Sequence, residues 1–218
     1  MPSITIHGGN MKYNYNGSML TYEEVVEIIK QRVHEISLLG KLIGYENILD
    51  KSKFHEPIMA EILGHEAFKK ISAGKNSDKY GADAHDRTSG KMAEYKSMTL
   101  KDKQIPNLLR KPKGKKGLEY VAFTVFGIYN GAYTLEAIEA YDKHDHYFSV
   151  FHEEKCILII KPDHNYVIGT LVKNYEERQA KSNKGTSNLN TVKIDLANEF
   201  LYEVVYRDDE WYKKHGGT

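Results

Sequence analysis

Apolar residues recur every three to four positions after the first twenty residues of the chain. They are Val25, Val26, Ile28, Ile29, Val33, Ile36 and Leu39. Thr21 and Glu24 precede them with the spacing of a capping box. This pattern predicts a helix with one buried face. A second helix is predicted to run from about Pro57 to Lys70, with Pro57 in its first turn. Its inward-facing residues are expected to be Ile58, Ile62, Leu63 and Phe68.

The segment from Gly81 to Ser97, GADAHDRTSGKMAEYKS, has the pattern of a β-hairpin. If its turn is Arg87–Gly90, residues whose numbers sum to 177 face each other across the two strands. Asp83 then lies opposite Glu94. The alternation of a pleated strand predicts two faces. The polar face holds Gly81, Asp83, Glu94 and Lys96, and the apolar face holds Ala82, Ala84, Ala93 and Tyr95.

The polar face of this hairpin carries an electrostatic cost, because like charges opposite one another on paired strands repel. A hard divalent cation bound by Asp83 and Glu94 would remove the repulsion. Oxygen ligands with few protein donors suit Mg²⁺ that is bound together with a substrate phosphate. The hairpin therefore predicts a Mg²⁺ site.

Further strands are predicted in the second half of the chain. Residues 119–141, EYVAFTVFGIYNGAYTLEAIEAY, have the pattern of two β-rich runs that meet at Tyr129-Asn130-Gly131. KCILIIK and residues 192–206 are expected to form either further strands or a strand and a helix. We expect one mixed α/β (α+β) domain over residues 1–218, with a central antiparallel or mixed sheet flanked by helices. Residues 1–70 would be mainly helical and serve dimerisation or DNA contact, residues 71–160 would form the catalytic sheet, and residues 161–218 would add a DNA-contact loop and strands.

Charge is balanced overall, at +1, but residues 101–117 carry seven Lys and Arg against one Asp. This basic segment is either a solvated loop or a phosphate-contacting surface. No apolar run is long enough to span a bilayer and the N-terminus lacks the pattern of a signal peptide, so we expect a cytoplasmic protein without a membrane partner. The single Cys156 is expected to be a buried strand residue.

An Asp followed about ten residues later by Glu-x-Lys resembles the PD-(D/E)xK nuclease superfamily. The segment is more closely similar to the PvuII-like type II restriction endonucleases, whose central motif has the form G-x-D-A-x-D, a short turn, and E-x-K-S. The matching residues are Gly81, Asp83, Ala84, Asp86, Gly90, Glu94, Lys96 and Ser97. Residues 126–138 resemble the paired strands that follow in those enzymes, and residues 190–194 resemble a polar segment near their C-terminus.

The resemblance implies a restriction-endonuclease-like core and a Mg²⁺-dependent type II site-specific deoxyribonuclease. Asp83 and Glu94 would ligate Mg²⁺, Lys96 would orient or activate the attacking water, and Glu61 would be an auxiliary catalytic carboxylate. A symmetric homodimer would cut double-stranded DNA at a palindromic site and leave 5′-phosphate ends. The alternatives are a repair or junction-cleaving nuclease of the same fold and a DNA-binding module without catalysis.

DNA contacts are expected from three places. His85 shares the polar face of the hairpin and would contact phosphate or sugar, although an inert surface role fits it equally well. A lysine cluster in the basic segment comprises Lys111, Lys113, Lys115 and Lys116. A polar loop cluster comprises Asn183, Lys184, Ser187, Asn188 and Asn190. These residue types reach phosphates and base edges, but a plain flexible loop is an equal alternative for the polar loop cluster. His144, Asp145, His146 and His152 match no familiar ligand spacing and are expected at the surface, near a strand end.

Overall fold

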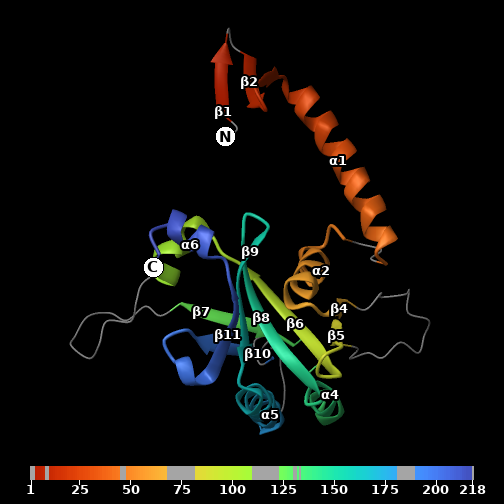
Figure 1. Cartoon of the computed structure of the whole chain (residues 1–218), viewed down its shortest axis with the longest axis vertical. Coiled ribbons are helices and arrows are strands. Elements are labelled where there is room, and N and C mark those ends of the chain that lie inside the picture. The colour runs from red at the N-terminus through yellow and green to blue at the C-terminus, as the bar shows by residue number, and fades with distance from the viewer. Residues whose placement is uncertain are drawn as a thin grey trace, which may run out of the picture. The chain divides into compact units, whose positions relative to one another are not determined.

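The computed structural model describes residues 3–7, 10–44, 48–67, 82–109, 123–129, 132, 134–180 and 190–217. The chain divides into two compact units, Met1–Lys53 with Lys69–Ser72, and Phe54–Phe68 with Ala73–Thr218. Figure 1 shows the elements of both units along the chain. Among the described residues, every helix is too short or too polar to cross a membrane.

The N-terminal unit contains a three-stranded antiparallel sheet and a long helix. The strands are β1 (Ser3–His7), β2 (Asn10–Tyr15) and β3 (Ser18–Leu20). Asn16 and Gly17 join β2 to β3 with φ angles of 52° and 83°. Asn-Gly is the pair that best tolerates this left-handed backbone in a two-residue hairpin turn. These three strands were not predicted from the sequence.

Helix α1 (Tyr22–Leu42) begins at the predicted capping box. Thr21 Oγ1 accepts a hydrogen bond from the Glu24 backbone N–H at 3.3 Å, and Glu24 Oε2 accepts one from the Thr21 N–H at 2.7 Å. The predicted helix is confirmed, but its expected buried face is wrong. Ile29, Val33 and Leu39 are 55%, 40% and 61% exposed. Periodicity identifies the apolar side of a helix and does not show whether the same chain covers it.

The second unit is built on a six-stranded sheet in the order β11-β9-β8-β6-β5-β4. The strands are β4 (Glu66–Ala67), β5 (Ala84–Asp86), β6 (Lys91–Thr99), β8 (His144–His152), β9 (Lys155–Pro162) and β11 (Tyr202–Arg207). Neighbours are antiparallel except β6 and β8, which are parallel. The prediction of a mixed α/β fold with a mixed central sheet is confirmed, and so are the strands at KCILIIK and within residues 192–206.

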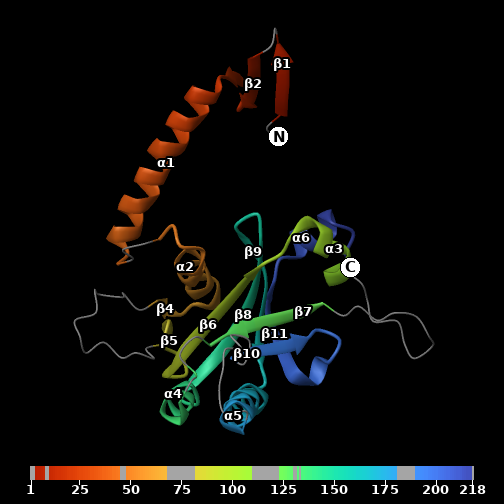
Figure 2. The same ribbon diagram turned by 180° about the vertical axis from the view of Figure 1, so that it is seen from behind.

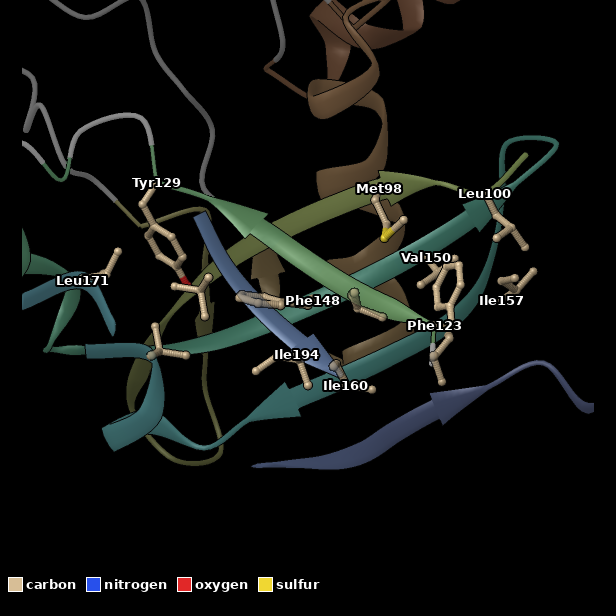
Figure 3. Packing of buried hydrophobic residues seen from close by; sticks show 14 of the residues in the cluster. Met98, Leu100, Phe123, Tyr129, Phe148, Val150, Ile157, Ile160, Leu171 and Ile194 are labelled. Carbon is tan, nitrogen blue, oxygen red and sulfur yellow. The ribbon is translucent and has the colours of Figure 1, made fainter. Parts of the chain in front are cut away.

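Apolar side chains cover both faces of this sheet. On one face, a two-stranded ribbon of β7 (Thr124–Ile128) and β10 (Thr191–Asp195) lies over the cluster that contains Phe148, Ile160 and Ile194 (Figure 3). On the other face, Met59 of helix α2 (Lys51–Leu63) packs against a second cluster. Figure 2 shows α2 beside the hairpin strands, seen from behind. Cys156 is buried in this second cluster, as predicted.

The remaining helices connect and flank the strands. They are η1 (Asp102–Gln104), α3 (Ile105–Leu109), α4 (Leu135–Tyr141), α5 (His164–Ala180), η2 (Glu199–Leu201) and α6 (Asp209–Lys214). Helix α5 was not predicted from the sequence.

The bounds of the second predicted helix are wrong. Helix α2 begins at Lys51 and ends at Leu63, so Pro57 lies inside it and not in its first turn. Gly64 follows with a φ of 68°, a left-handed conformation typical of the residue after a helix. Ile58, Ile62 and Leu63 pack inward as predicted, and Phe68 lies outside the described residues.

The expected hairpin over residues 119–141 is also wrong in its second half. β7 is a strand as predicted, but it pairs with β10, and the following run forms α4. Thr134 caps this helix, because its hydroxyl accepts a hydrogen bond from the Ala137 N–H at 3.2 Å. The TLEAIEAY run contains Leu, Glu and Ala, which favour a helix, and this preference outweighs the Asn-Gly signal before it. Asn130 and Gly131 lie outside the described residues.

Candidate active site

The β5–β6 hairpin has the predicted register, with Ala84 opposite Ala93 and Asp86 opposite Lys91. Asp86 organises the turn, because its carboxylate accepts hydrogen bonds from the Ser89 hydroxyl at 2.6 Å and the Thr88 N–H at 2.8 Å. These bonds lower the pKa of Asp86 to about 2. The turn at Arg87–Gly90 is thus confirmed.

The two faces of the hairpin are also as predicted where they are described. Ala84, Ala93 and Tyr95 pack into the cluster beneath α2. Asp83, just before β5, is tied to β6 by two hydrogen bonds: its N–H donates to Ala93 O at 2.9 Å, and its Oδ2 accepts from the Tyr95 N–H at 2.9 Å. Asp83 and Glu94 are only 6% and 5% exposed. The hairpin therefore buries two carboxylates near each other.

Lys96 supplies the positive charge beside these carboxylates. Its ammonium group forms an ion pair with Glu94 Oε1, and its side chain is 15% exposed. Burial alone would lower the pKa of Lys96, but the Glu94 and Asp83 carboxylates outweigh burial and raise this pKa above its ordinary value. Lys96 therefore remains protonated at neutral pH.

Aromatic rings and a glycine enclose the Lys96 side chain. The Lys96 Nζ lies 4.8 Å from the centroid of the Tyr129 ring and 5.9 Å from that of Tyr141. A Cβ at Gly127 of β7 would lie 2.8 Å from Lys96 Cγ and 2.7 Å from Phe148 Cζ. Only glycine therefore lets β7 approach β6 this closely. These rings and this glycine were not predicted as part of the site, although a glycine inside a strand is a signal of close backbone approach.

Strand β8 lies parallel to β6 and carries two histidines, His144 and His146, close to Glu94. His146 is paired with Glu94 in the β6–β8 register and is 1% exposed, and Tyr129 Oη lies 3.0 Å from its Nδ1. Burial lowers the pKa of His146 to about 3, so its ring is neutral. The His144 side chain is 10% exposed, and its Nδ1 lies 3.9 Å from Glu94 Oε2. Burial lowers the pKa of His144, opposed by the Asp83 carboxylate.

The expected surface position of this histidine-rich segment is wrong. Asp145, His146 and His152 are buried, because β8 has neighbouring strands on both sides and packed layers on both faces. His152 is held by two hydrogen-bonding partners, Trp211 Nε1 at 3.1 Å and Asp102 Oδ1 at 2.9 Å. The polar residue types alone suggested that the segment is exposed. Buried polar side chains need hydrogen-bonding partners, and Trp211 and Asp102 are such partners for His152.

The residues of this site fit a hard divalent cation in their chemistry. Asp83 and Glu94 offer carboxylate oxygens, the donors that Mg²⁺ prefers. In the part of the chain that the structure describes, no three His, Cys, Asp or Glu side chains already surround one point at ligand distances. Lys96 neutralises Glu94 in this arrangement.

The other predicted site residues lie in different places. Glu61 is exposed on α2, which packs on the Tyr95 side of the sheet and not on the Lys96 side. His85 is half-buried in β5, between Glu66 of β4 and Met92 of β6. Asn190 is buried, and its Oδ1 accepts a hydrogen bond from Arg178. The lysine cluster and the rest of the polar loop cluster lie outside the described residues.

Comparison of the chain with protein-family models gave no match, and comparison with curated proteins gave no significant match.

Proposed function

We propose that the chain is a Mg²⁺-dependent DNA endonuclease of the PD-(D/E)xK type, similar to the PvuII-like type II restriction enzymes. The observation that carries this proposal is the grouping of Asp83, Glu94 and Lys96 by one hairpin. Burying two carboxylates and an ammonium group costs solvation free energy, which a fold with no use for them would avoid. Such grouped, buried charges are typical of functional sites.

The surrounding architecture supports the same proposal. A restriction-endonuclease-like core needs the Asp and the Glu-x-Lys on adjacent strands of a mixed sheet flanked by helices. Here β5 follows Asp83, β6 carries Glu94 and Lys96, and α2 covers the opposite face.

The residues of the site would divide the work of phosphodiester hydrolysis. Asp83 and Glu94 would hold the metal through oxygen atoms. Mg²⁺, when bound, supplies activation of a water molecule and stabilisation of the charge that develops on the phosphate. Lys96 would orient the attacking water or the scissile phosphate through its protonated ammonium group, because its raised pKa makes it a poor proton acceptor. Cleavage would leave 5′-phosphate and 3′-hydroxyl ends.

A symmetric homodimer would place one such site on each strand of a palindromic double-stranded target. Helix α1 supports this part of the proposal. Tyr22, Ile29 and Ile36 repeat at intervals of seven residues, with Leu39 three residues after Ile36, and all four are exposed. Ile29, Ile36 and Leu39 match the combination of Ile and Leu found in two-stranded coiled coils, whereas the positions equivalent to Leu39 in the two preceding repeats hold Arg32 and Val25. Ile36→Lys would be expected to convert a dimer to a monomer in sedimentation experiments, whereas Lys30→Ala, on the polar side, would not.

Incubation with plasmid DNA and Mg²⁺ tests the proposed activity. Discrete fragments are expected, with no cleavage in EDTA or by Asp83→Ala. Nicking that depends on DNA structure and not on sequence would favour a repair or junction nuclease. Binding without any cleavage would favour a DNA-binding module and refute the enzymatic proposal.

A further inference from the structure

His144 has a buried nitrogen atom that the nuclease proposal does not use. Its Nδ1 is shielded from solvent and makes no hydrogen bond within the described part of the chain. Lys96 pairs with Oε1 of the Glu94 carboxylate, and the other oxygen, Oε2, lies 3.9 Å from His144 Nδ1. An unpaired buried polar atom costs free energy, so its retention indicates a ligand.

The position of the ring is set by the fold. His144 begins β8, and the parallel register puts it opposite Met92, which lies two residues before Glu94 and on the same face of the sheet. The Tyr141 ring contacts it edge to face, with centroids 6.4 Å apart. Glu94 of β6 and the imidazole nitrogen of β8 therefore approach each other beside the hairpin that also carries Asp83.

We propose that His144 is a nitrogen ligand of the metal held by Asp83 and Glu94, and that this site selects a first-row transition dication such as Mn²⁺ over Mg²⁺. The inference rests on the proposed metal site and changes its chemistry. Mg²⁺ takes oxygen ligands almost exclusively, whereas imidazole strengthens binding of first-row transition ions. A separation of 3.9 Å between Nδ1 and Glu94 Oε2 is within the span of two ligands on one ion, because each metal–ligand bond is about 2.1 Å long.

The test is Mn²⁺ binding to the purified full-length protein without DNA, measured by electron paramagnetic resonance. The expected pulsed spectrum of the wild type shows coupling to an imidazole nitrogen, which is lost in His144→Gln and kept in His164→Gln. His164 is the matched control, because its ring lies near the site, stacked on His146, but pairs with Asp142. Mn²⁺ affinity should fall about tenfold or more in His144→Gln. Mg²⁺ affinity, measured by competition, should change much less.

A wild-type spectrum without nitrogen coupling would overturn the proposal, even if His144→Gln failed to fold. Coupling that persists in a folded His144→Gln protein would also overturn it. His144→Asp keeps the number of ligands, and we expect it to bind Mn²⁺ without nitrogen coupling and with a lower preference over Mg²⁺. Nitrogen coupling in a protein that cuts no DNA would support His144 as a metal ligand and refute the proposed nuclease activity. Mg²⁺-dependent cleavage without nitrogen coupling would support the nuclease activity and refute His144 as a ligand.

Discussion

Replacement of Lys96 by Met tests whether its ammonium group stabilises the buried carboxylates. The variant keeps most of the side-chain volume beneath Tyr129 and removes the charge. Removing one partner of a buried ion pair costs about 3–5 kcal/mol. Because Lys96 is still 15% exposed, we expect the low end, about 3 kcal/mol, at pH 8 in EDTA. Urea unfolding followed by Trp211 fluorescence measures this cost, since this buried residue is the single Trp and belongs to the same unit.

The pH dependence of this difference has a definite sign. The folded-state pKa of Lys96 is raised, so its stabilisation is fully present below the unfolded-state pKa and is lost only as the pH rises through the higher folded-state value. Between pH 5 and pH 8 the contribution of Lys96 itself is therefore constant. The part of the difference in unfolding free energy that comes from the Lys96 charge should therefore be the same at pH 5 and pH 8.

A double-mutant cycle separates this effect from a general packing defect. Glu94→Gln combined with Lys96→Met should be less destabilised than the sum of the single variants, by about 1.5 kcal/mol or more. An additive double variant would show that the destabilisation of Lys96→Met comes from packing and not from the lost charge.

Three further predictions concern a glycine, a tyrosine hydroxyl and the basic segment. Gly127→Ala forces a Cβ against Phe148 and Lys96 and should cost about 1–3 kcal/mol in urea unfolding, whereas Gly169→Ala, with open space in α5, should be neutral or stabilising. Tyr129→Phe removes the hydroxyl beside His146 Nδ1 and should cost about 1–2 kcal/mol, and an unchanged unfolding midpoint would contradict that contact. Neutralising the lysine cluster should weaken DNA binding and flatten its dependence on salt, and an unchanged slope would leave the basic segment a solvated loop.

The hairpin could be predicted from sequence because all of its determinants are local. A turn with Gly90, a two-residue alternation and a short separation fix its register, and with it the relation of Asp83, Glu94 and Lys96. The neighbours of these residues could not be predicted, because the pairing of β6 with β8 joins segments about fifty residues apart. Burial of His146 follows from that long-range pairing and not from its own sequence context.

Other errors have equally specific causes. The helix α4 replaced a predicted strand because Thr134 and the run after it favour a helix, while the Asn-Gly signal received too much weight. The exposed side of α1 shows the opposite limit, since its local pattern was interpreted correctly as a helix and its packing was not. Local residue preferences thus predicted the helices and strands more accurately than they predicted which of their side chains are buried.

The short separation of Glu94 and Lys96 along the sequence has a consequence for the order in which the strands of the sheet come together during folding. Both residues belong to β6, and Asp83 lies on the adjoining arm of the same hairpin, so the positive and negative charges meet as soon as the hairpin forms. Strand β8 and the ribbon of β7 and β10 are much farther from the hairpin along the sequence, and contacts between distant segments form more slowly. We expect these later elements to dock on a hairpin that already carries its own counterion. The sheet can then close over this region without burying an uncompensated pair of negative charges.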